Sequence, residues 1–322
     1  MYFKQAKDGE NEWWMYLVTT FLVGLGYFMG QMPLYYTQLS AIENNPAIGT
    51  AELDEFNARM DFSILGIDSN LGLLLLFTIF IVATVFFVFA IRFVHHKSLK
   101  GLITHRSKIN WPKIFFGLVV WLVLLSVFEL ISYFAMPEVY TLNVQWGKIF
   151  WLMLICLLIL PIQTTLEELF FRSYIMKGLG LIASHKWVPL LITSMLFGVV
   201  HGTNPEIAKY GIVPMQIYYV GAGLLLGIMT IMDDGLELAI GVHAATNIYG
   251  ALFMSYEGSV LQTDSIWRMS EVNAWLMAGI FLISGVLFLL LSKKMFDWGP
   301  WSKCWEEIDH NENIMSANII KD

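Results

Sequence analysis

Charged residues are scarce in this chain. Only 14% of its 322 residues are Asp, Glu, Lys or Arg, whereas soluble domains carry about 25%. Hydrophobic residues make up 57% of the chain. This composition excludes an ordinary soluble domain and indicates a polytopic membrane protein.

Cysteine is almost absent, and several common site motifs are missing. Cys156 lies in an apolar run and Cys304 in the polar C-terminal segment, so neither a disulfide framework nor a thiolate metal cluster is expected. The sequence contains no Walker loop, dinucleotide-binding fingerprint or EF-hand pattern. It also has no face that combines basic and aromatic residues, and we therefore expect no nucleic-acid partner.

Long apolar runs fill much of the sequence. A membrane-spanning helix needs about 20 mostly apolar residues. The first run is too long for the core of a signal peptide, so it is predicted to be a retained span. The chain is expected to form one all-α helical membrane bundle of about eight spans. These are Trp13–Tyr36, Leu71–Val94, Trp111–Phe134, Trp146–Lys177, Val188–Thr203, Ile212–Met232, Leu236–Met254 and Trp275–Leu291.

The bundle divides into three predicted regions. Residues 1–145 hold the first three helices and a basic loop, residues 146–292 hold the other helices, and residues 293–322 form a polar tail. Loops rich in Lys and Arg stay in the cytoplasm. With both termini in the cytoplasm, 15 of the 19 Lys and Arg residues lie on that side. The basic loop between Arg92 and Lys113 is either an ordinary cytoplasmic loop or a contact for anionic lipids.

Three of the predicted spans carry polar side chains at apolar depth, where a single charge costs roughly 2.5–3.5 kcal/mol. Glu168 and Arg172 are four residues apart, so they share a helix face and can pair. Glu167 is rotated about 100° away from them and can point into a cavity. The complete set is Glu167, Glu168 and Arg172 in the fourth span, His201 in the fifth, and His243 and Asn247 in the seventh.

The polar groups of the three spans are expected to meet at one depth. At 1.5 Å per residue they lie roughly 12–21 Å from the predicted cytoplasmic ends of their helices. We therefore expect one site between the cytoplasmic surface and the bilayer centre.

Each group also has a purely structural explanation. His201 or His243 could simply join two helices through a hydrogen bond. Glu168 and Arg172 could be a buried pair that fixes the helix. Glu167, in contrast, has no evident partner in its own helix, which suits a general base.

The motifs EELFFR, FGVVH and HAATN follow one another on three of these spans and match the patterns EExxxR, FxxxH and HxxxN. Between Trp146 and Met254 the chain therefore resembles the CPBP family, the CAAX-protease and bacteriocin-processing (Abi) intramembrane proteases. The resemblance implies a glutamate endopeptidase that needs no cofactor. Glu167 would be the catalytic base and His201 would hold the attacking water.

The resemblance also implies roles for the other four residues. His243 and Asn247 would donate hydrogen bonds to the oxyanion of the tetrahedral intermediate, because preorganised donors stabilise charge that develops in the transition state. Glu168 and Arg172 would order the site. Since hydrolysis needs water, we expect a cavity that opens to the cytoplasmic half.

Three other functions stay open at this point. Two histidines and a glutamate could bind zinc and hydrolyse a peptide bond with metal assistance, although there is no HExxH and Arg172 would repel a cation. A proton-coupled transporter also uses buried Glu and His, but we see no repeated halves with broken helices. A non-catalytic immunity or binding protein is the third alternative.

The sequence does not name the substrate. The partners that we expect are membrane lipids and a peptide or membrane-protein substrate, either prenylated or of the leader-peptide type. The compact form favours a bacterial inner (plasma) membrane protein.

Overall fold

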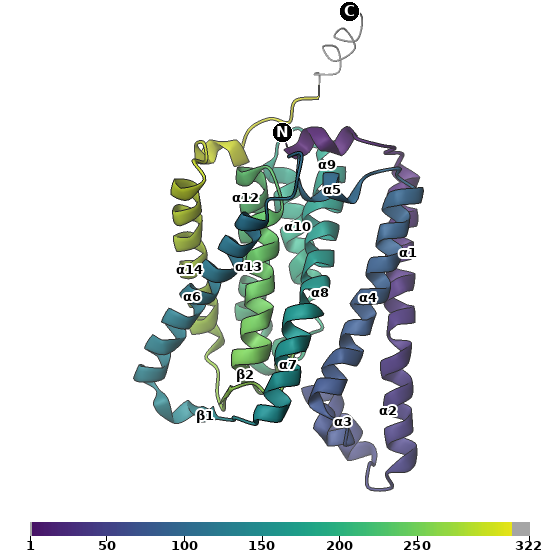
Figure 1. Cartoon of the computed structure of the whole chain (residues 1–322), viewed down its shortest axis with the longest axis vertical. Helices are drawn as coiled ribbons and strands as arrows, with labels where there is room; N and C mark the ends of the chain where they lie inside the picture. The colour runs from purple at the N-terminus through teal and green to yellow at the C-terminus, as the bar shows by residue number, and fades with distance from the viewer. Residues whose placement is uncertain (1, 311–322) are drawn as a thin grey trace, which may run out of the picture.

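The computed structural model of the chain describes residues 2–310 and shows a helical bundle (Figure 1). This is the fold class that the hydropathy predicts. Its α-helices are α1 (Trp13–Gly30), α2 (Met32–Asn44), α3 (Thr50–Arg59), α4 (Ser69–Phe93), α5 (Leu99–Ile103), α6 (Trp111–Ala135), α7 (Trp146–Leu158), α8 (Leu160–Glu167), α9 (Met176–Gly180), α10 (Trp187–Val200), α11 (Pro205–Tyr210), α12 (Ile212–Asp233), α13 (Glu237–Ile248) and α14 (Ala274–Met295).

Six helical stretches within the described residues are long and apolar enough to cross a membrane. They are Trp13–Asn44, Ser69–Phe93, Trp111–Ala135, Trp146–Gly180, Ile212–Asp233 and Ala274–Met295. The other two predicted spans correspond to the shorter helices α10 and α13. The count of eight spans therefore stays a prediction for these two.

The short helix α13 is enclosed by other helices and is buried over most of its length. Gly241 lets its backbone touch α6, because a Cβ at this position would lie 2.1 Å from the carbonyl oxygen of Ile114. One turn further along, the Trp121 indole of α6 donates a hydrogen bond of 2.8 Å to Thr246 Oγ1. These contacts seat the HAATN segment in the middle of the bundle.

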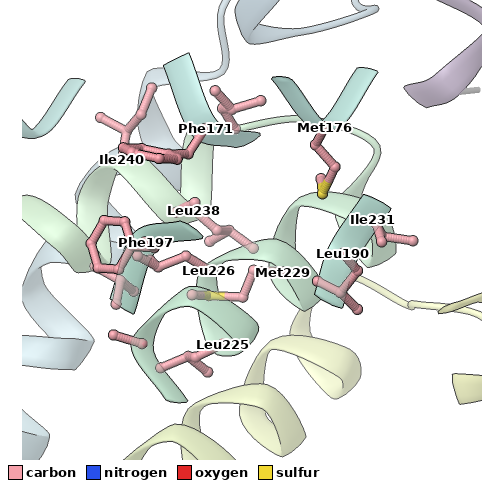
Figure 2. Packing of buried hydrophobic residues seen from close by; sticks show 14 of the residues in the cluster. Phe171, Met176, Leu190, Phe197, Leu225, Leu226, Met229, Ile231, Leu238 and Ile240 are labelled. Carbon is pink, nitrogen blue, oxygen red and sulfur yellow. The ribbon is translucent and has the colours of Figure 1, made fainter. Parts of the chain in front are cut away.

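A hydrophobic core surrounds the segment that carries the EELFFR motif. Figure 2 shows Phe171 of this segment and Phe197 of α10 in the same cluster as Leu225, Leu226 and Leu238. Close packing of this kind resists displacement of its members. The polar residues of the motif are thus built on a rigid apolar framework.

One end of the bundle, which we call the basic end, is formed by residues 2–12, 94–113, 176–190, 230–237 and 296–310. Buried ion pairs close it. Asp233 receives hydrogen bonds from Lys113 Nζ (2.5 Å) and Trp298 Nε1 (3.0 Å), and Arg106 pairs with Asp233 (3.5 Å) and Glu237 (3.4 Å). The 3-10 helices η1 (Tyr2–Lys7) and η6 (Trp301–Cys304) pack onto this end.

The predicted polar tail is more structured than the sequence indicates. Residues 293–295 belong to α14, and residues 296–310 pack against the basic end. Lys303 Nζ donates to Asp234 Oδ2 at 2.8 Å, and the Ile308 amide donates to the Ser184 carbonyl at 2.9 Å. The rest of the predicted tail, residues 311–322, lies outside the described residues.

The opposite end, which we call the loop end, is formed by residues 45–68, 136–145, 201–211 and 254–273 (Figure 1). It holds the 3-10 helices η2 (Phe62–Leu65) and η3 (Pro137–Val139) and a small sheet of strands β1 (Tyr140–Leu142), β2 (Met254–Tyr256) and β3 (Trp267–Met269). The strand order is β1-β3-β2, with β1 antiparallel and β2 parallel to β3. Strands of three residues carry too little pattern to be predicted from an apolar sequence.

Candidate active site

All but the first residue of the EELFFR motif lie in a π-helix, η4 (Glu168–Ile175), which continues α8 without a break. The first residue, Glu167, is the last residue of α8. Such π segments are rare in proteins, and those that do occur are often found at functional sites. Glu168 and Arg172 are both fully buried, and Arg172 Nη1 donates to Glu168 Oε1 at 2.8 Å. The pairing that the spacing predicts is therefore present, in a wider helix than the α-helix from which it was inferred.

His243 links this ion pair to Glu167. Its Nδ1 lies 2.7 Å from Glu168 Oε1, and its Nε2 lies 3.6 Å from Glu167 Oε2. Because Glu168 also accepts from Arg172, we assign the Nδ1 proton of His243 to the bond with Glu168. The ring is thus fixed from one side and presents Nε2 to Glu167.

Gln163 is a member of the site that the sequence analysis missed. Its Nε2 donates to Glu167 Oε1 at 2.5 Å, and its Oε1 accepts from Asn247 Nδ2 at 3.0 Å. The expectation that Glu167 has no partner in its own helix is therefore wrong, because an amide one turn earlier holds one carboxylate oxygen. The four-residue spacing between Gln163 and Glu167 was the available signal.

His201 follows the last residue of α10 and faces the site from another wall. Its Nδ1 lies 2.7 Å from the Phe197 carbonyl oxygen. A carbonyl can only accept, so Nδ1 carries the proton and Nε2 of the neutral ring keeps its lone pair. The ring of Tyr219 stacks on His201 with centroids 4.5 Å apart.

Phe197, the aromatic residue of FGVVH, touches three of the polar groups. The Arg172 guanidinium carbon lies 4.2 Å from the centroid of its ring, a cation–π arrangement. The His201 and His243 rings lie 4.3 and 5.9 Å from it. Phe197 therefore fixes the spacing between the two histidines.

Glu167 and its partners line a cavity of about 1380 Å³. Four of the predicted residues belong to its wall, namely Glu167, His201, His243 and Asn247, together with Gln163. The other two, Glu168 and Arg172, lie behind the wall. The second carboxylate oxygen of Glu167, Oε2, is buried and has no hydrogen-bond partner among the described residues.

The cavity extends away from the basic end. Its lining residues come from the middle of the bundle and from the loop end, and none comes from the segments of the basic end. If the termini are cytoplasmic, as predicted, this cavity does not lie in the cytoplasmic half, so the two expectations do not fit one orientation. The physical reason is that ion pairs and the packed segments 2–12 and 296–310 fill the basic end, whereas the cavity reaches the loop end.

A metal site was the main chemical alternative for these residues. Within residues 2–310 no group of three His, Cys, Asp or Glu side chains lies close enough to bind an ion. His243 uses Nδ1 for Glu168, and Arg172 places a cation beside that pair. The donor set thus fits zinc poorly, and independence from a cofactor stays a prediction.

A helical membrane bundle with a buried glutamate, two histidines and an amide on a central cavity has the groups that a membrane-embedded hydrolase needs. Comparison with known proteins gives the family. Residues 145–249 match the family described as type II CAAX prenyl endopeptidase Rce1-like. The chain is also 32% identical, over 255 residues, to the uncharacterized protein YyaK of Bacillus subtilis (strain 168). This alignment covers 79% of this chain and 82% of YyaK.

The chain therefore belongs to the Rce1-like family of CAAX prenyl endopeptidases within the CPBP proteases. Membership indicates a membrane protease that acts on a peptide substrate. No solved structure matches the chain.

Proposed function

We propose that the protein is an intramembrane endopeptidase in which Glu167 activates a water molecule for attack on a peptide bond. One observation carries the proposal: Glu167 Oε2 is a buried carboxylate oxygen without a hydrogen-bond partner, on a cavity wall that also holds His201 and His243. An unpartnered polar atom in such a place is costly unless it is used. Family membership supports the same chemistry.

The reaction uses one water molecule and one proton carrier. The water would donate one hydrogen bond to Glu167 and one to the Nε2 lone pair of His201. As its oxygen attacks the peptide carbonyl carbon, Glu167 takes the proton. When the carbon–nitrogen bond breaks, Glu167 returns this proton to the leaving amine, so that one water yields one acid and one amine.

Asn247 and His243 would stabilise the oxyanion. The Asn247 amide has two N–H groups; one is bound to Gln163, and the other is available for the developing charge. In this proposal His243 also carries a proton on Nε2 and donates it in a hydrogen bond to the oxyanion, while the bond from Nδ1 to Glu168 holds the ring in place. Glu168 and Arg172 act through His243 by holding its ring.

A cleavage assay tests this proposal against the zinc alternative. Purified protein in detergent is incubated with a library of transmembrane, leader-type and prenylated peptides, with and without a strong chelator. We expect cleavage that the chelator does not reduce. Cleavage that is lost with chelator and restored by zinc would instead establish a metalloprotease, and a folded protein that binds peptides without cleaving them would establish a binding protein.

We further propose that the basic end faces the cytoplasm of a bacterial plasma membrane. Most of the Lys and Arg residues lie at this end, as the positive-inside rule requires of a cytoplasmic face. The Bacillus relative supports a bacterial membrane. The cavity then opens through the loop end toward the outer half of the bilayer. This favours a leader-type peptide or a transmembrane segment as substrate over a prenylated tail in the cytoplasm.

Two serine-to-cysteine variants test this orientation. Ser270 is exposed at the loop end and Ser107 at the basic end, while both native cysteines are buried. In intact cells a membrane-impermeant maleimide should label Ser270→Cys and leave Ser107→Cys unlabelled, and permeabilised cells should label both. The reverse pattern in intact cells would place the cavity on the cytoplasmic side.

A further inference from the structure

A second buried carboxylate, Glu206, lies in the wall of the same cavity. It belongs to α11, five residues after His201, and is 2% exposed. Its Oε1 accepts a hydrogen bond of 2.7 Å from the Val260 amide. Its Oε2 is buried without a hydrogen-bond partner among the described residues. Neither the sequence motifs nor the mechanism above uses this residue.

Four tyrosines of the cavity wall lie within electrostatic range of Glu206, namely Tyr210, Tyr218, Tyr219 and Tyr256. Tyr210 and Tyr256 have centroids 5.8 Å apart, and Tyr218 and Tyr219 have centroids 5.4 Å apart. All four rings line the cavity. Tyrosine faces attract organic cations, most strongly where water is excluded. A carboxylate among several tyrosines is therefore an environment suited to an ammonium or guanidinium group.

The charges of the cavity lining also favour a cationic ligand. The described residues that line the cavity include four glutamates and one lysine. That lysine, Lys209, is bound to Glu257 at 2.9 Å, outside the cavity lining. No lining residue offers Glu206 a free cation. Burial raises the pKa of the Glu206 carboxyl, while the hydrogen bond from the Val260 amide and the nearby Tyr219 hydroxyl lower it.

We propose that Glu206 and the four tyrosines form a subsite for a basic side chain of the substrate, Lys or Arg. The subsite lies next to the reacting centre, because Tyr219 both lines it and stacks on His201. A bound cation would satisfy Glu206 Oε2 directly. The proposal rests on the proposed function, since it names the class of substrate that the cavity accepts: a peptide with a basic residue near the scissile bond.

Peptide binding tests the subsite without requiring cleavage. The probes are fluorescein-labelled leucine–alanine peptides that carry one lysine at successive positions, each paired with a norleucine peptide of the same length. Fluorescence anisotropy is measured on full-length Glu167→Gln protein in detergent, so that no probe is consumed. At one position lysine should bind roughly 10- to 100-fold more tightly than norleucine, the range for a hydrogen bond to a charged group.

Two further variants assign this preference. Glu206→Gln keeps the acceptor for Val260 and should abolish the preference for lysine, whereas Glu271→Gln removes an exposed carboxylate from the cavity lining and should preserve it. The inference is overturned if lysine is preferred at no position, or if Glu206→Gln leaves the preference intact while its thermal unfolding matches the parent. Failure of the proposed function would show separately, as absence of cleavage by the wild-type protein.

Discussion

Replacing Glu167 with glutamine should lower kcat for peptide cleavage by roughly 10²- to 10⁴-fold, the usual contribution of a general base. Glutamine has almost the same shape, and its carbonyl oxygen can still accept the hydrogen bond from Gln163. It cannot take a proton from water. The fold should therefore persist while hydrolysis stops. The measurement is steady-state cleavage of a fluorogenic peptide, with the unfolding temperature of both proteins determined in the same detergent.

A matched control separates this effect from loss of a carboxylate in general. Glu43 is an exposed glutamate in α2, outside the cavity. Glu43→Gln should cleave like the wild type. Retention of wild-type kcat in Glu167→Gln would contradict the assignment and transfer the role of base to another group of the cavity.

Replacing Arg172 with alanine should reduce the free energy of unfolding by about 3–5 kcal/mol, because it leaves the buried Glu168 carboxylate without its cation. The guanidinium is also lost from the face of Phe197. Unlike Glu167→Gln, this change should lower the unfolding temperature as well as activity. Thermal unfolding in detergent, followed by tryptophan fluorescence, measures the first effect.

A double variant shows whether the unpaired charge is the cause. In Glu168→Gln/Arg172→Met both charges are gone, and the glutamine carbonyl can still accept from His243 Nδ1. Much of the stability lost in Arg172→Ala should return, since a buried ion pair contributes less than its broken half costs. A double variant as unstable as Arg172→Ala would attribute the loss to packing around Phe197 instead.

The two expected results distinguish the adjacent glutamates of the motif. Glu167 lines the cavity, whereas Glu168 is directed to Arg172 and His243. One carboxylate is exposed to the reacting space and the other is neutralised behind it. Changes at Glu167 should thus act on catalysis, and changes at Glu168 or Arg172 should act on both stability and catalysis.

The sequence by itself determined the class of fold and most of the candidate site residues. Hydropathy identifies spanning helices because the bilayer core requires about 20 apolar residues with internally satisfied backbones. Charged groups inside such helices are expensive, so Glu167, Glu168 and Arg172 stood out from their surroundings. The pairing of Glu168 with Arg172 followed from helical spacing alone.

Only the tertiary structure decided how these groups are connected and where the cavity lies. Spacing could have pointed to Gln163, but its bond to Asn247 could not be read from the sequence. Glu206 is unremarkable in sequence, because its significance depends on Val260 and on tyrosines that come mostly from other segments. The position of the cavity depends on how residues 2–12 and 296–310 pack over the basic end. Such contacts join residues far apart in the chain, and no local pattern of hydropathy or spacing encodes them.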